Sequence, residues 1–195
     1  LRPQWKSWLV RGAYIITVFG GLITMKLMGN IFEISMDLVW MIGGVFAILG
    51  AVYTAFLFNQ ARARDLWQTP IQSAIHMLLH AVMAGSVVMM FIAPESSQWM
   101  TNILFWGIIA NMIIIAKEIL MPHDTPDTKK AIHLMTKGYY SKYFWFGITF
   151  GNLGSAVILF TLTGNWILLA GAMALVGIYL TEYVRIRVPQ MIPLS

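Results

Sequence analysis

The chain has 195 residues, of which 58% are hydrophobic and 11% are charged, and its formal net charge at pH 7 is +5. Because a soluble domain usually carries about 25% charged residues, this composition excludes an ordinary soluble protein. The chain has no cysteine, which excludes a disulfide and the thiolate ligands of an iron–sulfur cluster within it. The positive charge favours contact with anionic lipids rather than with nucleic acid.

Six long apolar stretches account for almost the whole chain. They cover residues 8–29, 37–60, 71–93, 98–121, 142–164 and 166–185. Each has about the 20 residues that a helix needs to cross a bilayer, and none shows the alternation of a membrane β-barrel strand. The sequence therefore predicts an all-α fold, a polytopic transmembrane helical bundle with six spans in this chain.

Lysine and arginine are distributed unevenly between the two sides that these spans define. Lys26 is the one basic residue on its side, whereas twelve lie on the other side, in loops or at span ends. The twelve are Arg2, Lys6, Arg11, Arg62, Arg64, Lys117, Lys129, Lys130, Lys137, Lys142, Arg185 and Arg187. Since loops rich in basic residues stay in the cytoplasm, we expect both ends of the chain to be cytoplasmic.

One connection between spans is much longer than the others. Residues 122–141 join the fourth and fifth spans on the predicted cytoplasmic side, and residues 128–138 have the pattern of a short interfacial helix. We therefore expect three parts: residues 1–121 with four spans, the link at 122–141, and residues 142–195 with two spans and a cytoplasmic tail. In the last part, Gly147 and Gly151 form a Gly-x-x-x-Gly motif, which is typical of closely packed membrane helices.

The third span carries a row of polar side chains. Gln72, His76 and His80 are spaced by four residues, which places them on one face of a helix, and His80 lies about 14 Å along it. Because imidazole titrates near neutral pH, this row is a candidate proton path from the cytoplasm; the alternative is two histidines that hydrogen-bond neighbouring helices. A charged histidine is costly within a membrane, so we expect both to be mainly neutral at rest.

Two further groups of polar residues have a functional and a structural interpretation. Asn111 and Glu118 lie seven residues apart, nearly on one face of the fourth span, and they extend the candidate proton path unless Glu118 is a charge at headgroup level. Lys26, Glu33 and Asp37 gather at the first outer connection. They are suited to orienting a quinone carbonyl or docking a partner, and the alternative is a set of solvated surface charges.

The histidines do not suit a bis-histidine haem. His76 and His80 share one helix face, so they cannot bind opposite sides of one iron, and His123 and His133 belong to the long link. A haem that joins His76 to His133 is conceivable but weakly supported. The sequence has no glycine-rich phosphate loop, metal-cluster motif or nucleophile triad.

Residues 53–70 hold the most distinctive pattern in the chain. They contain Tyr-Thr-Ala-Phe-Leu at 53–57, then Ala-Arg-Ala-Arg-Asp-Leu-Trp-Gln-Thr-Pro at 61–70. This pattern resembles the helix end, small basic loop and W-x-x-P helix start of the NrfD-type membrane subunits, the polysulfide reductase membrane-subunit family. Residues 2–14 resemble the start of that family's third helix, residues 138–147 the start of its seventh, and residues 189–195 its tail.

The resemblance implies an eight-helix fold, usually two four-helix bundles, of which this chain matches the third to eighth helices. The chain begins with Leu1, so we expect further residues upstream. In the family the first bundle largely builds the quinol site, near the outer surface, and the matching part of this chain lies around Asp37. The candidate quinone-binding residues are therefore Lys26, Glu33, Asp37, Trp40 and Met41.

The implied function is that of an integral membrane subunit of a multi-subunit respiratory oxidoreductase in the prokaryotic inner membrane. It would bind menaquinone or ubiquinone, hold no haem or iron–sulfur cluster itself, and exchange electrons with a ferredoxin-like iron–sulfur subunit. That subunit would connect it to a molybdopterin-type catalytic subunit, and the polar residues of the third and fourth spans are compatible with proton translocation. The alternatives are a cytochrome b-type haem subunit and a non-redox structural anchor or transporter.

Overall fold

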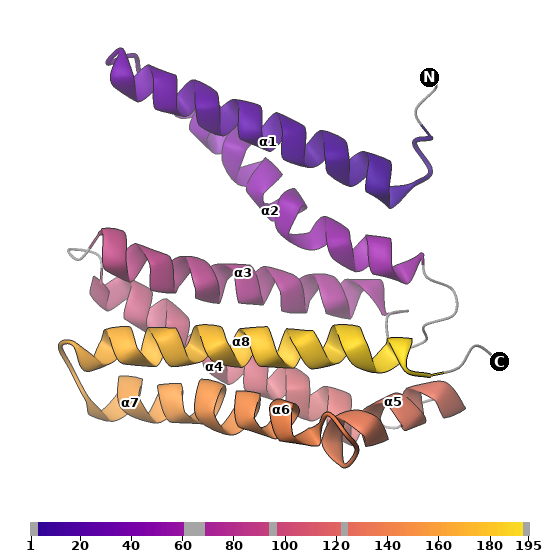
Figure 1. Cartoon of the computed structure of the whole chain (residues 1–195). Helices are drawn as coiled ribbons and strands as arrows, with labels where there is room; N and C mark the ends of the chain where they lie inside the picture. Colours follow the sequence, from indigo (N-terminus) through magenta and orange to yellow (C-terminus); the bar gives the residue numbers. More distant parts are fainter. Residues whose placement is uncertain (1–3, 61–68, 94–96, 122–124, 193–195) are drawn as a thin grey trace. The chain divides into compact units, whose positions relative to one another are not determined.

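The computed structural model describes residues 4–60, 69–93, 97–121 and 125–192. These residues form helices and contain no strand (Figure 1). Six helical segments among them are long and apolar enough to cross a membrane, so the predicted all-α membrane fold is confirmed. Arg2, Arg62, Arg64 and His123 lie outside the described residues, as does most of the 61–70 stretch that carries the family resemblance.

The helices follow one another along the chain with short connections. They are α1 (Trp8–Ile31), α2 (Asp37–Asn59), α3 (Pro70–Ile92), α4 (Ser97–Leu120), α5 (Pro126–Thr136), α6 (Ser141–Phe146), the π-helix η3 (Gly147–Gly154), α7 (Ser155–Thr161) and α8 (Trp166–Gln190). The fifth span is the continuous run of α6, η3 and α7.

Three helices differ from the sequence prediction in an instructive way. The predicted interfacial helix at 128–138 begins earlier, at Pro126, because the Thr125 side chain accepts a hydrogen bond from the Thr128 N–H (3.2 Å) and proline suits the first helical position. The last span continues beyond residue 185 to Gln190, since Pro189 lies in the final turn, where its missing N–H costs only one bond. The π-helix in the fifth span was not predicted.

Contacts divide the chain into two compact units. Of the described residues, unit 1 contains 4–60 and 69–78, and unit 2 contains 79–93, 97–121 and 125–192. Helix α3 begins in unit 1 and ends in unit 2. The three parts predicted from the sequence, at 1–121, 122–141 and 142–195, stay a prediction.

In unit 1, α1 and α2 form an antiparallel pair (Figure 1). At one end, the Trp8 and Phe56 rings stack with centroids 4.5 Å apart, and a side chain at Gly12 would overlap the ring of Tyr53. At the other end, Glu33 turns the chain with a φ of 56°, a left-handed conformation that is uncommon outside glycine. Most large apolar side chains of both helices face outward, as lipid-facing residues do.

In unit 2, α8 packs against the fifth span at very close range. A Cβ atom at Gly151 would overlap the backbone of Gly177, and one at Gly147 would lie 3.2 Å from the Leu180 side chain. The predicted close-packing role of Gly147 and Gly151 is therefore confirmed. Because glycine brings the two backbones together, side chains of α8 and η3 share one interior with those of α4.

The amphipathic α5 is anchored to unit 2 by its apolar face. Its buried Ala131, Ile132 and Met135 belong to a core cluster with Phe144 of α6 and with two valines of α8, Val184 and Val188. The Lys129, Lys130 and His133 side chains lie on the exposed face, which suits a helix at the membrane interface.

Candidate functional site

A connected group of polar side chains lies within the spanning helices of unit 2. We call it the polar cluster, and its members are His80 of α3, Asn111 and Glu118 of α4, Asn152 of η3, and Glu182 and Arg185 of α8. Four of them, His80, Asn111, Glu118 and Asn152, are buried. Ionisable groups within a membrane are costly, so such a group is a functional-site hypothesis by default.

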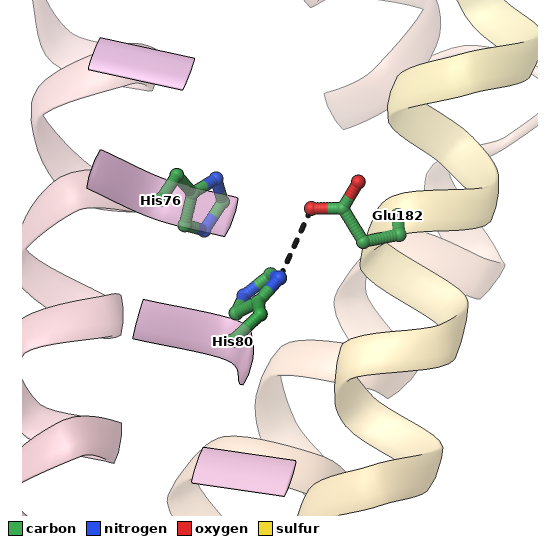
Figure 2. A group of neighbouring side chains, drawn as sticks. All are labelled: His76, His80 and Glu182. Carbon is green, nitrogen blue, oxygen red and sulfur yellow. Dashed lines mark ion pairs between the residues drawn. The ribbon is translucent and has the colours of Figure 1, made fainter. Parts of the chain in front are cut away.

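His80 occupies the centre of the polar cluster. Its Nδ1 lies 3.0 Å from Oε1 of Glu182, and its Nε2 lies 3.0 Å from Oδ1 of Asn111. Figure 2 shows the His80 ring directed towards Glu182, with His76 one turn earlier on the same helix. Side chains of α8 and α4 therefore contact opposite edges of the His80 ring and orient it.

The amide groups of Asn111 and Asn152 continue the hydrogen bonds away from His80. Asn111 Nδ2 donates to Asn152 Oδ1 (2.9 Å), and Asn152 Nδ2 points to the carbonyl oxygen of Gly147 (3.5 Å, a weak bond). Asn152 lies in the π-helix, and π-helical turns are frequent at functional sites. The wider turn and the glycines around it let this amide reach the middle of the unit.

Arg185 joins the two carboxylates of the polar cluster. Its Nη2 lies 3.4 Å from Oε1 of Glu118, and its Nη1 lies 3.9 Å from Oε1 of Glu182. Glu118 is only 8% exposed, so its charge needs a partner of opposite sign within the protein. The result is an unbroken series of groups from Glu118, two residues before the end of α4, through Arg185 and Glu182 to His80.

Three of the five predicted proton-path residues, His80, Asn111 and Glu118, are members of the polar cluster. Gln72 and His76 lie earlier on α3, one helical turn apart, and His76 is also buried, with its ring next to that of His80 (Figure 2). Glu118 is buried and lies beside Arg185. The role of these five residues in proton transfer stays a prediction.

Sequence reasoning missed three members of the polar cluster. Glu182 and Arg185 lie at the predicted cytoplasmic end of the last span, where Arg185 was counted only as an anchor for topology. Their i,i+3 spacing, which places them on one helix face, was an available signal. Asn152 lies among glycines that were interpreted as helix-packing residues, so its amide group was not considered.

Unit 1 contains a cavity of about 610 Å³ between α1 and α2, which we call the α1–α2 cavity. Three of the five predicted quinone-binding residues, Lys26, Trp40 and Met41, line it. The rest of its lining consists of the apolar side chains Phe19, Leu22, Ile23, Val39 and Ala47 and two glycines, Gly43 and Gly44. Its volume is within the range of small-molecule sites, and an apolar wall with one polar group is their usual composition.

The other two predicted quinone-binding residues lie at the connection between α1 and α2. Glu33 is in the turn, and Asp37 is the first residue of α2, where it accepts a hydrogen bond from the Ser35 hydroxyl (2.9 Å). Neither is among the described residues that line the α1–α2 cavity. Asp37 has a local structural role at the helix N-terminus, where a carboxylate is favoured by the helix dipole.

The polar cluster and the α1–α2 cavity suit different ligands. His80 and Glu182 offer a ring nitrogen and a carboxylate oxygen, which suit a proton or a cation. The α1–α2 cavity suits a flat apolar ring with a hydrogen-bond acceptor for Lys26. Comparison with protein-family models, curated proteins and solved structures finds no significant match to this chain.

Proposed function

We propose that this membrane protein is the quinone-reactive subunit of a multi-subunit respiratory oxidoreductase, and that the polar cluster of unit 2 conducts protons. The observation that carries the proposal is the series of ionisable groups within the spanning helices, from Glu118 through Arg185 and Glu182 to His80. Quinone reduction consumes two protons for every two electrons, so a quinone-reactive membrane protein needs a proton supply. The quinone provides the redox chemistry, and the protein provides its site and the proton route.

The energetic cost of the polar cluster supports a functional role. Bringing two carboxylates and a guanidinium out of water costs several kcal/mol for each ion, which mutual attraction repays only in part. Apolar residues of similar size would pack the same helices at no such cost. A structural anchor has no need of these charges, so the cluster favours the proton-conducting function over that alternative.

The α1–α2 cavity supports the quinone part of the proposal. Its aromatic and aliphatic wall provides contacts for a quinone ring and its apolar tail, and the Lys26 ammonium group can donate a hydrogen bond to a quinone carbonyl. We propose that an iron–sulfur subunit exchanges electrons with this quinone and links it to a molybdopterin-type catalytic subunit. These partners, and a prokaryotic inner-membrane location with cytoplasmic chain ends, follow from the family resemblance and the distribution of basic residues.

A cytochrome b-type subunit is the second candidate. Haem ligation needs a ring nitrogen directed at the iron, and both ring nitrogens of His80 lie 3.0 Å from side-chain oxygens of other helices. The ring would have to leave Glu182 or Asn111 to bind a haem. The polar cluster therefore favours the proton-conducting function.

A variant that fills the α1–α2 cavity tests the quinone site. A Cβ atom at Gly44 meets no heavy atom within 4 Å, so Gly44→Phe introduces a ring into the cavity without a backbone clash. Gly50→Phe is the matched control, because Gly50 lies on the same helix, also has open space around its Cβ, and does not line the cavity. We expect Gly44→Phe to weaken binding of menaquinone or ubiquinone to the intact complex at least about tenfold, the effect of ~1.4 kcal/mol.

The same complex tests the partners. A tag on this chain should co-purify a subunit with the electron paramagnetic resonance signal of iron–sulfur clusters. Equal quinone affinity in the Gly44→Phe, Trp40→Ala and wild-type complexes would show that unit 1 does not contain the quinone site. A Soret band in this chain would indicate bound haem and would favour the cytochrome b-type alternative over the proposal.

A further inference from the structure

We propose that a groove between α5 and the end of α8 binds an anionic phospholipid, with the lipid phosphate held by lysines of α5 and an acyl chain against an apolar floor. The groove, which we call the α5–α8 groove, has a volume of about 530 Å³. Its lining residues are Lys129, Lys130, His133, Leu134, Met191 and Ile192. All of them belong to unit 2, and the inference is independent of the quinone site and of the polar cluster.

The α5–α8 groove lies at the depth of the lipid headgroups. One wall is α5, and the other is Met191 and Ile192, which come directly after α8 ends at Gln190 (Figure 1). The Trp145 indole N–H donates to the Thr136 carbonyl oxygen (2.9 Å) and so ties the end of α5 to the start of the fifth span. Spanning helices end, and tryptophan is enriched, at the boundary between hydrocarbon and water. A ligand in this groove therefore meets lipid headgroups and acyl chains together.

The polar part of the groove is basic. Lys129 and Lys130 are exposed, and His133 follows them by four and three residues, which places the three side chains on one side of α5. The Lys130 ammonium group also lies 3.2 Å from Oδ1 of Asp127, a surface ion pair of the kind that contributes little to stability. Lysine offers three donors and no acceptor, so an anion with several oxygen acceptors is the ligand that this side of α5 fits.

The other half of the lining is apolar. Ile192 is buried in the core cluster that anchors α5, Leu134 packs against the same cluster, and Met191 lies beside them with 57% of its surface exposed. An inorganic phosphate ion gains nothing from such a floor, whereas an acyl chain removes apolar surface from water when it covers it. A phosphodiester joined to an acyl chain combines both kinds of contact.

A membrane lipid is the occupant because the groove lies where the bilayer supplies one. Basic pockets at the cytoplasmic end of spanning helices are typical sites for anionic headgroups, and the leaflet rests on the cytoplasmic orientation proposed above. A lipid in the groove contacts α5 and the residues after α8 at the same time. Because it binds only where these two segments are folded together, it should also raise the melting temperature of the complex.

Photolabelling of the intact complex tests the site with a phosphatidylglycerol that carries a photoreactive acyl chain. We expect labelled peptides from this chain to contain Leu134 or Met191, and phosphatidylcholine with the same chain to label them weakly. The double variant Lys129→Gln/Lys130→Gln should raise the lipid concentration for half-maximal labelling at least about tenfold.

The matched control is the double variant Lys137→Gln/Lys142→Gln. It removes the same charge from two exposed lysines that follow in the chain and do not line the groove. We expect it to label as the wild-type complex does. An equal loss in the two double variants would mean that the lysines attract anionic lipid without a site, and it would overturn the proposal.

Two further measurements separate the lipid from other occupants. Met191→Gln should weaken labelling while both groove lysines remain, and inorganic phosphate should not displace the lipid. If phosphate displaces it and Met191→Gln has no effect, the groove binds a phosphate group alone and the proposal fails. It also fails if a carbodiimide crosslinks Lys129 to a co-purified subunit, which would identify a protein as the occupant. If the lipid binds but a tag beside Lys129 is labelled from the outer side alone, the lipid site stands and the proposed orientation fails.

Discussion

Arg185→Met tests whether one guanidinium holds the polar cluster together. In the wild-type protein this group lies 3.4 Å from Glu118 and 3.9 Å from Glu182. The variant keeps an unbranched, flexible side chain but removes the positive charge that faces the two carboxylates. Removing one partner of a buried ion pair costs about 3–5 kcal/mol, because the other partner stays buried and uncompensated.

This cost is large enough to measure in the whole protein. For a chain of this size, each kcal/mol shifts the melting temperature by about 2–4 °C, so we expect a decrease of about 6–20 °C. The decrease can be followed by tryptophan fluorescence during thermal unfolding of the complex in lipid nanodiscs. Adding Glu118→Gln and Glu182→Gln to Arg185→Met should recover most of the loss, because the uncompensated charges are then absent.

A matched control lies two residues further along the same helix. Arg187 is exposed, and its guanidinium lies 5.8 Å from the centre of the Tyr183 ring. Arg187→Met removes the same charge from α8 but should cost less than about 1 kcal/mol. If the melting temperature of Arg185→Met is as high as that of Arg187→Met, the reasoning about the polar cluster is refuted.

Three further predictions concern packing, topology and proton transfer. Gly151→Val should destabilise the protein by about 1–3 kcal/mol by separating the fifth span from α8, whereas Gly50→Val, which meets open space, should not; equal melting temperatures would contradict this. An accessibility tag beside Lys129 should be labelled from the cytoplasm, and labelling from the outer side alone would reverse the topology. His80→Leu should slow proton-coupled turnover while electron transfer and assembly persist, and full turnover in both His80→Leu and His76→Leu would make the histidine row structural.

The spans were predictable because they depend on local properties of the sequence. Their predicted ends lie within three residues of the observed ones except in α8, where Pro189 was taken as the start of the tail. The π-helix was not predictable in the same way. Glycines at 147, 151 and 154 are consistent with an ordinary helix and with a widened one, and the structure shows the wider turn where the fifth span contacts α8.

The candidate sites were predictable only in part. Residue type and spacing identified His80, Asn111 and Glu118 as polar groups worth a hypothesis. The family resemblance added Trp40 and Met41 to Lys26, and the structure shows that these three residues line one cavity. They did not identify Glu182 as the partner of the His80 ring. Two residues on different helices meet only when both helices have the right rotation and depth, and neither property is encoded in the hydrophobicity of one helix.

The sequence by itself determined that this is a membrane protein with six helical spans, because the free energy of burying a helix in lipid is a sum over about 20 neighbouring residues. The tertiary structure decided what the polar residues do. Close contact between Gly151 and Gly177 sets the position of α8 against the fifth span. That position places Glu182 and Arg185 beside His80 and Glu118, so the charge and hydrogen bonds of each group depend on residues far away in the chain.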